Sequence, residues 1–323
     1  MALLTPMSLP EAEALGALFG LRVVGLEPVV HGSVNSNFAA ELEGGGKVFL
    51  RVCEESDHAA VAAQNRLLAH LVAAGIPTPA PLERKDGQGT VAAHAGRPVS
   101  VFGWCEGAWI CQERVTPRHL ERVGEVLAAL HRAGEGYEGA PVSRFDVQAL
   151  AARLAGLEDQ PLPEDVARDV AMLRERLAAV GEGPSPPAAP TVIHGDVFRD
   201  NVLWREDGSL SAVLDFESAS LGEPTFDLMV TLLAWCYGDA LEQGLARALL
   251  AGYQRERALS AEELAACHGY ACLAALRFAI TRITDYELRP RGVVAYKDYR
   301  RFTGRLAALD AIGVDAFAAW LTG

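Results

Sequence analysis

The sequence predicts an α+β protein with two lobes, a small β-rich lobe followed by a larger, mainly helical one. Three observations support this prediction. Short runs with strand character fill most of the first hundred residues, helical periodicity dominates the rest, and the change falls at a junction near Gly103–Ala108. Because strands and helices are segregated along the chain, a doubly wound α/β sheet is disfavoured. We therefore expect residues 1–103 to form one lobe and residues 104–323 the other.

The β-rich lobe is expected to contain five strands and one helix. The expected strands lie at residues 22–30, 36–43, 47–53, 88–93 and 98–102. The glycines at 44–46 supply a hairpin turn between the second and third strands. Residues 59–74 are rich in Ala and Leu and are followed by Gly75, which predicts a helix with a glycine C-cap. The prolines at 77, 79 and 81 then favour an extended segment.

The second lobe is expected to be helical over most of its length. Thr116-Pro117 has the residue types of an N-cap followed by a helix-starting proline. Apolar residues then recur at helical spacing, at Leu120, Val123, Leu127 and Leu130 and again at Val166, Val170, Leu173 and Leu177. Residues 181–190 form a Pro/Gly-rich loop, and helical patterns return from Phe226.

Composition excludes several classes of function. A hydrophobic fraction of 50% over 323 residues is enough for a substantial core. The formal net charge of -13, from 42 acidic and 29 basic residues, disfavours nucleic acid and, more weakly, an anionic membrane as partners. The six cysteines show no C-x-x-C spacing and are expected to be reduced and buried. The first ten residues lack a basic region, and the longest apolar run, 229–237, is too short to span a bilayer, so we expect a cytoplasmic protein.

Residues 192–217 carry the polar side chains with the clearest chemistry. Apolar runs predict short strands at 192–193, 202–204 and 210–214. Polar residues occupy the loop after the first strand and the exit of the last. We therefore expect Asp196, Asn201 and Asp215 to meet at one end of this structure.

Such a set of residues suits phosphoryl transfer to a hydroxyl group. One carboxylate can orient the hydroxyl and accept its proton, while further oxygen ligands hold Mg²⁺ on the nucleotide phosphates. The five-residue step from Asp196 to Asn201 fits a loop that aims both side chains into one cleft. The pattern resembles the H-R-D-x-x-x-x-N and D-F-G motifs of protein kinases.

His194-Gly195-Asp196, with Asn201 and Asp215, resembles the catalytic and metal motifs of the aminoglycoside phosphotransferase, choline kinase and homoserine kinase superfamily. The resemblance implies a bilobal protein-kinase-like fold and the cofactors ATP and Mg²⁺. It also implies that Asp196 is the catalytic base and that Asn201 and Asp215 are the metal ligands. Asp227, in G-E-P-T-F-D-L, matches an acidic position that braces the catalytic loop, and His194 is expected to support the same loop.

Further segments resemble bacterial homoserine kinases, and the similarity extends roughly from Leu21 to Leu309. The clearest is H-G-S-V-N-S-N-F at residues 31–38, which is similar to a G-x-x-N-S-N-(aromatic) pattern of that family. The other similar segments are residues 130–134, 198–203, 275–285 and 296–298. The resemblance implies that the acceptor is L-homoserine and the product O-phospho-L-homoserine, an intermediate of threonine biosynthesis.

The nucleotide is expected to contact the first lobe. The resemblance implies that the contacts are made by Gly32, Ser33, Asn35 and Arg51. Arg51 stands where the superfamily has a phosphate-contacting lysine, and it keeps the charge but not the point-like geometry. Gln64 is expected to replace the helical glutamate that pairs with that lysine.

Homoserine carries a carboxylate and an ammonium group, so its site needs a cation and an acidic or carbonyl partner. Arg277 and Arg282 lie on a predicted C-terminal helix and could bind the carboxylate, with Asp285 or Asp200 near the ammonium. For each of these residues the alternative is a surface salt bridge or a solvated face.

Two other functions remain open at this point. The chain could phosphorylate another small hydroxyl compound, such as an amino alcohol, a sugar or an aminoglycoside, and its overall acidity would suit a polycation. It could also be a non-catalytic nucleotide-binding module, which Arg51 and Gln64 favour but the presence of Asp196, Asn201 and Asp215 disfavours. The sequence leaves the oligomeric state open between monomer and homodimer.

Overall fold

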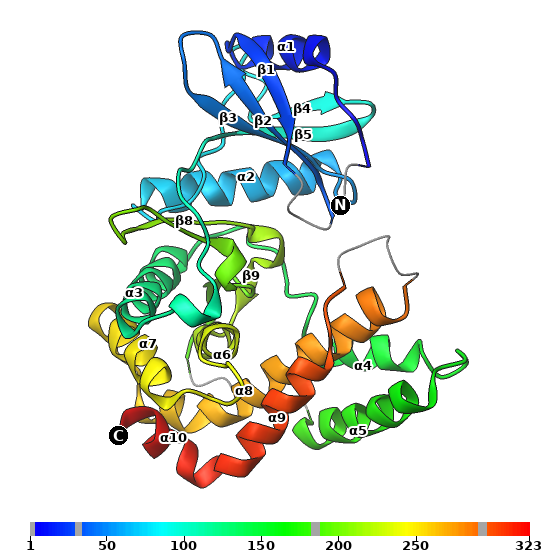
Figure 1. Ribbon diagram of the computed structural model, residues 1–323, viewed down its shortest axis with the longest axis vertical. Helices are drawn as coiled ribbons and strands as arrows, with labels where there is room; N and C mark the ends of the chain where they lie inside the picture. The colour runs from blue at the N-terminus through cyan, green and yellow to red at the C-terminus, as the bar shows by residue number, and fades with distance from the viewer. Residues whose placement is uncertain (1–3, 30–33, 182–187, 290–295) are drawn as a thin grey trace. The chain divides into compact units, whose positions relative to one another are not determined.

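The computed structural model describes residues 4–29, 34–181, 188–289 and 296–323 (Figure 1). The chain divides into two compact units. The first contains the described chain up to Ala108 together with Leu203–Leu214, and the second contains the other described residues from Trp109 on. The first unit holds a five-stranded sheet and the second is mostly helical, which confirms the predicted α+β class. The expected boundary at residues 103/104 lies five residues before the observed one at Ala108/Trp109, and it also misses Leu203–Leu214.

The first unit is built on one antiparallel sheet. Its strands are β1 (Val23–Pro28), β2 (Ser36–Leu42), β3 (Lys47–Val52), β4 (Val91–His94) and β5 (Arg97–Gly103). They are arranged in the order β1-β2-β3-β5-β4, and all lie at or close to the positions that the sequence predicts. Helix α1 (Leu9–Leu18), which the sequence analysis did not anticipate, packs with the sheet in one core.

The two faces of this sheet differ in chemistry. Val48, Leu50 and Val52 are buried in the core shared with α1. Because side chains alternate along a strand, Arg51 lies on the opposite face, across from Ser100 of β5. Helix α2 (His58–Ala73) contacts this second face, since the buried Asn65 donates a hydrogen bond to the Ser100 hydroxyl at 2.8 Å.

A second hairpin belongs to the first unit. Strands β7 (Val202–Trp204) and β8 (Leu210–Val213) pair with each other. Trp204 and Ala108 exchange two backbone hydrogen bonds of 2.9 Å, and the Val213 N–H donates to the Pro77 carbonyl at 2.7 Å. These bonds explain why Leu203–Leu214 packs with the β-rich unit.

The second unit consists of helices around a small two-stranded sheet. Strand β6 (Thr191–Ile193) pairs with β9 (Ser220–Gly222), a strand that the sequence did not predict. The helices are α3 (Pro117–Gly134), α4 (Val147–Ala155), α5 (Glu164–Val180), α6 (Pro224–Trp235), α7 (Gln243–Glu256), α8 (Ala261–Arg282), α9 (Arg300–Ile312) and α10 (Val314–Thr322). Helix α6 is buried along its whole length.

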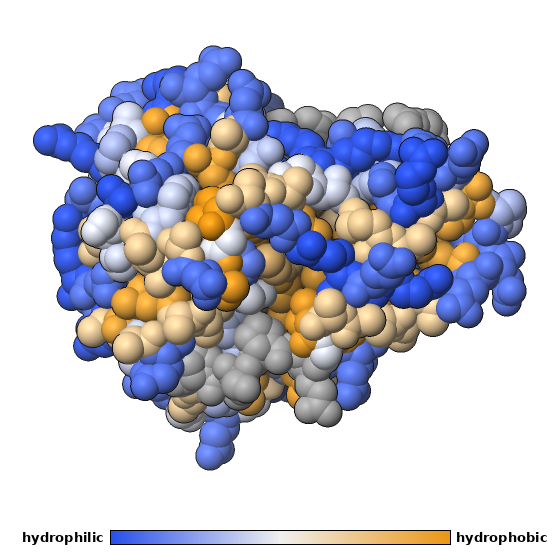
Figure 2. All heavy atoms as spheres, turned by 90° about the horizontal axis from the view of Figure 1, so that it is seen from below, coloured by the Kyte–Doolittle hydropathy of each residue, from blue (hydrophilic) through white to orange (hydrophobic). Residues whose placement is uncertain are grey.

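Two short helical turns flank the polar loops of the second unit, and a π-helical turn extends α8. These are η2 (Arg199–Asn201), η3 (Phe216–Ser218) and η4 (Ile283–Glu287). The continuous segment Ala261–Glu287 is long and apolar enough to cross a membrane, but 72% of its most apolar stretch is buried inside the protein. It is therefore placed as a core helix. Figure 2 shows one face of the molecule, on which hydrophilic and apolar residues are interspersed.

Candidate active site

The candidate active site lies in the second unit, in the loop that follows β6. The loop starts with His194-Gly195-Asp196 and ends at η2. Gly195 has a φ of +74°, and a Cβ atom there would lie 3.2 Å from the Ser218 carbonyl oxygen. Both the backbone conformation and the space therefore favour glycine at this position.

Asp227, in the first turn of α6, fixes the start of this loop. Its carboxylate accepts hydrogen bonds from the N–H of His194 at 2.7 Å and of Gly195 at 2.8 Å. The side chain is fully buried. Burial opposes its ionisation, but the hydrogen bonds and charges of His131 and His194 outweigh this effect and lower the pKa of Asp227. The expected bracing role of Asp227 is confirmed.

A second layer of buried side chains supports Asp227 and the loop. The His131 ring in α3 lies 3.0 Å from the Asp227 carboxylate through Nε2 and 2.7 Å from the Tyr253 hydroxyl through Nδ1. The His194 ring accepts the N–H of Asp196 at 3.1 Å, which confirms its supporting role. Trp235 donates its indole N–H to the Val197 carbonyl at 2.9 Å. The loop is thus held at several successive residues by groups that are out of contact with water.

Asp196, the expected base, is joined to Asn201, one of the expected metal ligands. The Asn201 amide nitrogen donates to the Asp196 carbonyl oxygen at 2.8 Å and lies 3.4 Å from its carboxylate. Asp196 as a whole residue is half-buried.

The surroundings of Asp196 raise its pKa to about 7. Burial is the largest cause, and the carboxylates of Asp215 and Asp200 act in the same direction. Arg277 and Lys297 oppose the rise. A carboxyl group with a pKa near 7 is suited to accept a proton at neutral pH.

Asp215 occupies an unusual backbone conformation directly before η3. Its φ and ψ of 63° and 72° are left-handed, which is uncommon for a residue other than glycine. Such strain is typical of functional sites. Its charge acts on Asp196, so Asp215 lies within electrostatic range of the loop in which Asn201 bonds Asp196.

The donor atoms of this group fit a divalent metal ion bound through oxygen. Asn201 directs its amide nitrogen to Asp196, which leaves its carbonyl oxygen as an acceptor. Asp215 supplies a carboxylate. Mg²⁺ binds through few protein oxygens when nucleotide phosphates supply others, so an amide and a carboxylate are sufficient.

Arg277, a buried residue of α8, contacts the loop that carries Asp196. Its guanidinium donates to the Gly195 carbonyl oxygen and stacks 3.9 Å from the centre of the Phe145 ring and 4.5 Å from that of Phe278. The side chain is 2% exposed. Burial lowers its pKa to about 10, although Asp196 and Asp227 oppose this. Arg277 therefore positions the loop, whereas the sequence suggested a contact with substrate.

The other expected acceptor residues have different surroundings. Arg282 donates to the Asp298 carbonyl at 2.9 Å and stacks 4.5 Å from the centre of the Phe302 ring. Burial is the main cause that lowers the pKa of Arg282 to about 10, and Arg301 adds to this. The charge of Asp196 opposes the lowering, so Arg282 lies within electrostatic range of the expected base. Asp285 forms an ion pair of 2.7 Å with Arg153. Asp200, in η2, is exposed.

The expected nucleotide residues lie in the first unit. Gly32 and Ser33 fall outside the described residues. Asn35 is buried, and its side-chain oxygen accepts the Glu54 N–H at 3.1 Å. Arg51 lies on the α2 face of the sheet, with its guanidinium 5.8 Å from the centre of the Phe49 ring.

Gln64 is half-buried on α2, and its expected role stays a prediction. On the face that carries Arg51, the α2 side chain that reaches the sheet is Asn65, which is fully buried and bonds Ser100.

The sequence analysis assigned no role to several side chains that support the site. His131 was noted only as part of a similar segment, and Tyr253 and Phe145 carried no signal. Lys297 lies close enough to lower the pKa of Asp196. Local sequence gives no sign of these partners, because each comes from an element distant along the chain.

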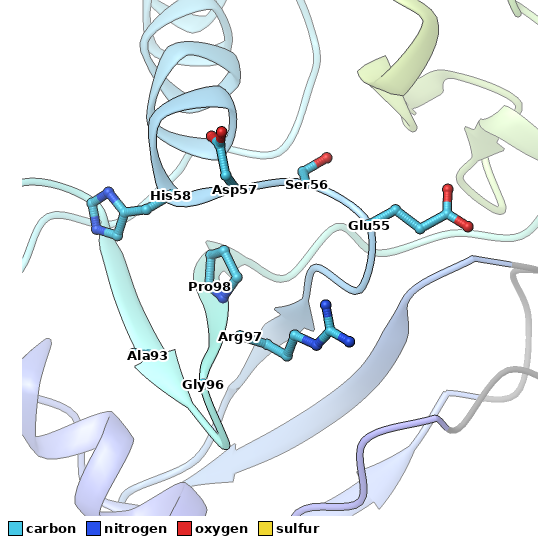
Figure 3. A pocket seen from close by; sticks show the side chains of 8 residues that line it. All are labelled: Glu55, Ser56, Asp57, His58, Ala93, Gly96, Arg97 and Pro98. Atoms are coloured by element: carbon cyan, nitrogen blue, oxygen red, sulfur yellow. The ribbon is translucent and has the colours of Figure 1, made fainter.

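A shallow pocket in the first unit has no link to this chemistry. It lies between the loop before α2 and the β4–β5 hairpin (Figure 3). Two of its polar side chains have structural partners: Asp57 caps α2 through the Ala60 N–H at 2.8 Å, and Arg97 donates to the Glu54 carbonyl at 2.6 Å. We assign it no function.

Residues 25–259 match the model of the phosphotransferase enzyme family, designated APH. The chain belongs to this family. Two curated relatives are the homoserine kinases of Rhodopseudomonas palustris, 35% identical over 78% of this chain and 79% of the relative, and of Methylocella silvestris, 31% identical over 97% of both. The resemblance to homoserine kinases is thereby confirmed, and the chain is an ATP-dependent small-molecule phosphotransferase.

Several solved structures share the fold at low identity. An amicoumacin kinase in complex with AMP-PNP and Ca²⁺ has a TM-score of 0.68 and 14% identity, with 94% of this chain and 93% of that chain covered. A spectinomycin phosphotransferase has a TM-score of 0.66 and 12% identity, with 98% of each chain covered. A microcompartment-associated aminopropanol kinase has a TM-score of 0.65 and 18% identity, with 96% and 99% covered.

Proposed function

We propose that the chain phosphorylates the hydroxyl group of L-homoserine with MgATP and releases O-phospho-L-homoserine and ADP. The homoserine kinases that match it over most of both chains carry this proposal. The loop of Asp196 supports it, because it offers a base with a pKa near 7 beside two oxygen ligands. We infer that this reaction takes place in the cytoplasm, as the sequence predicts.

In this proposal Asp196 is the base. It accepts the hydroxyl proton as the acceptor oxygen forms its bond to the γ-phosphorus, and the bond from that phosphorus to the bridging oxygen of ADP breaks. Arg277 and Asp227 hold the backbone of Gly195, so the base is fixed before substrate arrives. Fixed geometry of this kind contributes to the rate because little reorganisation is needed during the reaction.

Asn201 and Asp215 would hold the Mg²⁺ ion. When bound, the ion would neutralise part of the charge on the phosphate oxygens. Residues 1–103 would bind the nucleotide, through Gly32, Ser33, Asn35 and Arg51. Residues 104–323 would supply catalysis and acceptor binding.

The acceptor would be held by charged residues near Asp196. We assign its carboxylate to Arg282, which lies within electrostatic range of Asp196. Asp200 is the better candidate for the ammonium, because it is exposed and acts on Asp196, whereas Asp285 is engaged by Arg153. Arg277 would act through the loop.

An alternative acceptor is another small hydroxyl compound. The net charge of -13 would suit a cationic acceptor such as an amino alcohol or an aminoglycoside. A sugar is also compatible with the base. Each alternative uses the same loop and differs only in the groups that bind the acceptor.

An acceptor panel tests this proposal. Purified protein is incubated with MgATP and homoserine, choline, ethanolamine, methylthioribose or kanamycin, and both ADP formation and the phosphorylated product are measured. We expect homoserine to give the highest kcat/KM and a product of the mass of phosphohomoserine. A higher kcat/KM for any other acceptor would overturn the homoserine assignment and leave the kinase activity in place.

A further inference from the structure

Two arginines stack on one aromatic ring in the second unit, and two more lie within electrostatic range of them. They are Arg199 in η2, Arg282 at the end of α8, and Arg301 and Arg305 in α9. The Arg282 and Arg305 guanidinium groups stack 4.5 Å and 4.6 Å from the centre of the Phe302 ring. The Phe198 ring, next to Arg199 in the catalytic loop, lies 6.2 Å from the same ring. The cluster therefore reaches from α9 to the loop that carries Asp196.

The positive charge of this cluster is not balanced by nearby ion pairs. Within the described part of the chain, none of the four arginines has a carboxylate within 4.0 Å. Arg199 has a buried guanidinium nitrogen, Nη1, that finds no hydrogen-bond acceptor among the described residues. A buried donor without an acceptor is costly unless a ligand supplies one.

The mutual repulsion of these charges supports the same conclusion. Burial is the largest cause that lowers the pKa of Arg305 to about 9, and Arg301, Arg282 and Arg199 all add to the effect. Four cations thus lie within electrostatic range of one another. An anion between them would relieve this repulsion.

One arginine of this cluster uses its N–H donors on backbone carbonyls, and the other three have N–H donors left for a ligand. Arg305 directs Nε to the Leu233 carbonyl at 2.8 Å and Nη1 to the Arg301 carbonyl at 2.6 Å. Arg282 donates from Nη1 to the Asp298 carbonyl, and a guanidinium has five N–H donors. Arg305 is therefore a positioning residue, whereas Arg199, Arg282 and Arg301 have donors available for a ligand.

We propose that Arg199, Arg282 and Arg301 form an anion subsite that binds the carboxylate of the acceptor. The proposal rests on the proposed function, because it takes Asp196 as the base. Among the small hydroxyl compounds that the base could serve, it selects short hydroxy acids such as homoserine, and it excludes polycations by charge repulsion.

The position of the subsite favours the acceptor over the nucleotide. Arg282 lies within electrostatic range of Asp196, and Arg199 precedes Asn201 by two residues in the same loop. A short molecule whose hydroxyl group meets Asp196 can therefore place a carboxylate near Arg282. Because the guanidinium group of arginine is planar and charged at neutral pH, it binds a carboxylate better than a neutral group.

Acceptor analogues with and without the carboxylate test the subsite. Wild-type protein and the variants Arg282→Gln and Arg301→Gln are assayed with homoserine and with 3-amino-1-propanol, which lacks the carboxylate. We expect Arg282→Gln to raise the KM for homoserine by about 30-fold or more, with a smaller rise for Arg301→Gln. The KM for ATP and the kcat/KM for 3-amino-1-propanol should change by less than about twofold. Arg176→Gln serves as the control, because Arg176 is partly exposed and pairs with Asp310 outside the cluster.

The outcomes separate this subsite from the proposed function. If homoserine is the best acceptor but neither variant affects its KM, the subsite is wrong and the function stands. If another hydroxy acid is best and both variants impair it, the homoserine assignment is wrong and the subsite stands. A wild-type enzyme that does not prefer carboxylated acceptors would overturn the subsite.

A binding measurement covers the case in which no acceptor in the assay is turned over. The anion 4-hydroxybutyrate should raise the Tm of the wild-type protein and of Arg176→Gln, but not that of Arg282→Gln. Equal shifts in all three proteins, or no shift in the wild type, would contradict the subsite.

Discussion

At the scale of single residues, the chemistry depends on how charges around Asp196 are balanced. Burial, Asp215 and Asp200 favour its protonated form, and Arg277 and Lys297 favour the ionised form. The spacing of Asp196, Asn201 and Asp215 could be recognised in the sequence because all three lie in one local motif. Arg277 could not be placed, since a charge on an apolar helix reveals that it needs a partner but not which one. Its partners are the Gly195 carbonyl and two aromatic rings.

The first prediction concerns pH. Since Asp196 accepts a proton only when ionised and its pKa is raised to about 7, kcat/KM for the acceptor should rise between pH 6 and 8 and then level off. The measurement is kcat/KM from pH 5.5 to 9 at saturating MgATP, with coupling enzymes in excess at every pH. A profile that is flat across this range would show that Asp196 is not the titrating base.

The second prediction concerns the carboxylate of Asp196 itself. Asp196→Asn keeps the size and hydrogen-bonding capacity of the side chain but removes the base, so kcat should fall by about 10²–10⁴-fold or more. Circular dichroism and Tm should show that the variant is folded. The control is Asp207→Asn, in the exposed turn before β8, where activity should be unchanged. Near-normal turnover by folded Asp196→Asn would exclude the proposed mechanism.

The third prediction concerns Asp215. As a metal ligand it should be needed for the part of nucleotide binding that depends on Mg²⁺, so Asp215→Ala should weaken MgATP binding much more than acceptor binding. Titration of Mg²⁺ at a fixed ATP concentration, with calorimetry as the readout, measures this Mg²⁺-dependent binding. If the variant retains the Mg²⁺ dependence of the wild type, Asp215 does not bind the metal.

At the scale of elements, the strands and long helices followed from the sequence, whereas several pairings did not. The five strands of the first sheet are short runs with strand character bounded by turns, so local pattern was sufficient. Strand β9 is three residues long and pairs with β6 across η3, so its register depends on tertiary contacts. The hairpin β7–β8 was predicted, but its bonds to Ala108 and Pro77 are long-range, which is why the boundary near residue 103 missed it.

The approach of α3 and α7 shows how element packing supports the site. A Cβ atom on Gly252 would lie 2.0 Å from the Glu121 carbonyl oxygen, and one on Gly124 would lie 2.2 Å from that of Leu249. The two helices therefore touch backbone to backbone. This brings His131 of α3 within 2.7 Å of Tyr253 of α7, and His131 in turn bonds Asp227.

The fourth prediction follows from this contact. Gly252→Ala should destabilise the protein by about 2 kcal/mol or more, because the new methyl group forces the helices apart. It should also lower kcat, since His131 moves with α3. Gly244→Ala is the matched control in the same helix: it is exposed and its Cβ would meet nothing within 4 Å, so it should be neutral or stabilising by up to about 1 kcal/mol. Thermal unfolding and kcat of both variants test this, and equal stabilities would mean that the contact can relax.

At the scale of the whole molecule, acidity and stability are linked through buried carboxyl groups. The chain has 42 acidic against 29 basic residues, and some carboxyl groups are held where ionisation is unfavourable. Glu223, at the start of α6, is such a group. Burial is the main cause that raises its pKa from 4.5 to about 7, the nearby Glu263 carboxylate adds to the rise, and Arg257 opposes it. One of its carboxylate oxygens is buried without a hydrogen-bond partner among the described residues.

The last prediction concerns the pH dependence of stability. A carboxyl group with a raised pKa binds its proton more tightly in the folded state, so its contribution is complete below pH 4.5 and is lost as pH rises through 7. For Glu223 the full shift would correspond to about 3 kcal/mol, and partial exposure reduces this to about 1–2 kcal/mol. Glu223→Gln, which is always neutral, should therefore lose less stability than the wild type between pH 5 and pH 8.

His119, whose pKa is lowered chiefly by burial, acts in the opposite direction in both proteins and cancels in the comparison. The measurement is Tm and the free energy of unfolding in urea at both pH values. Glu164→Gln, on an almost fully exposed side chain, should follow the wild type. If Glu223→Gln and the wild type lose equal stability between the two pH values, Glu223 is already ionised in the folded protein and its surroundings are more polar than the burial of its carboxylate indicates.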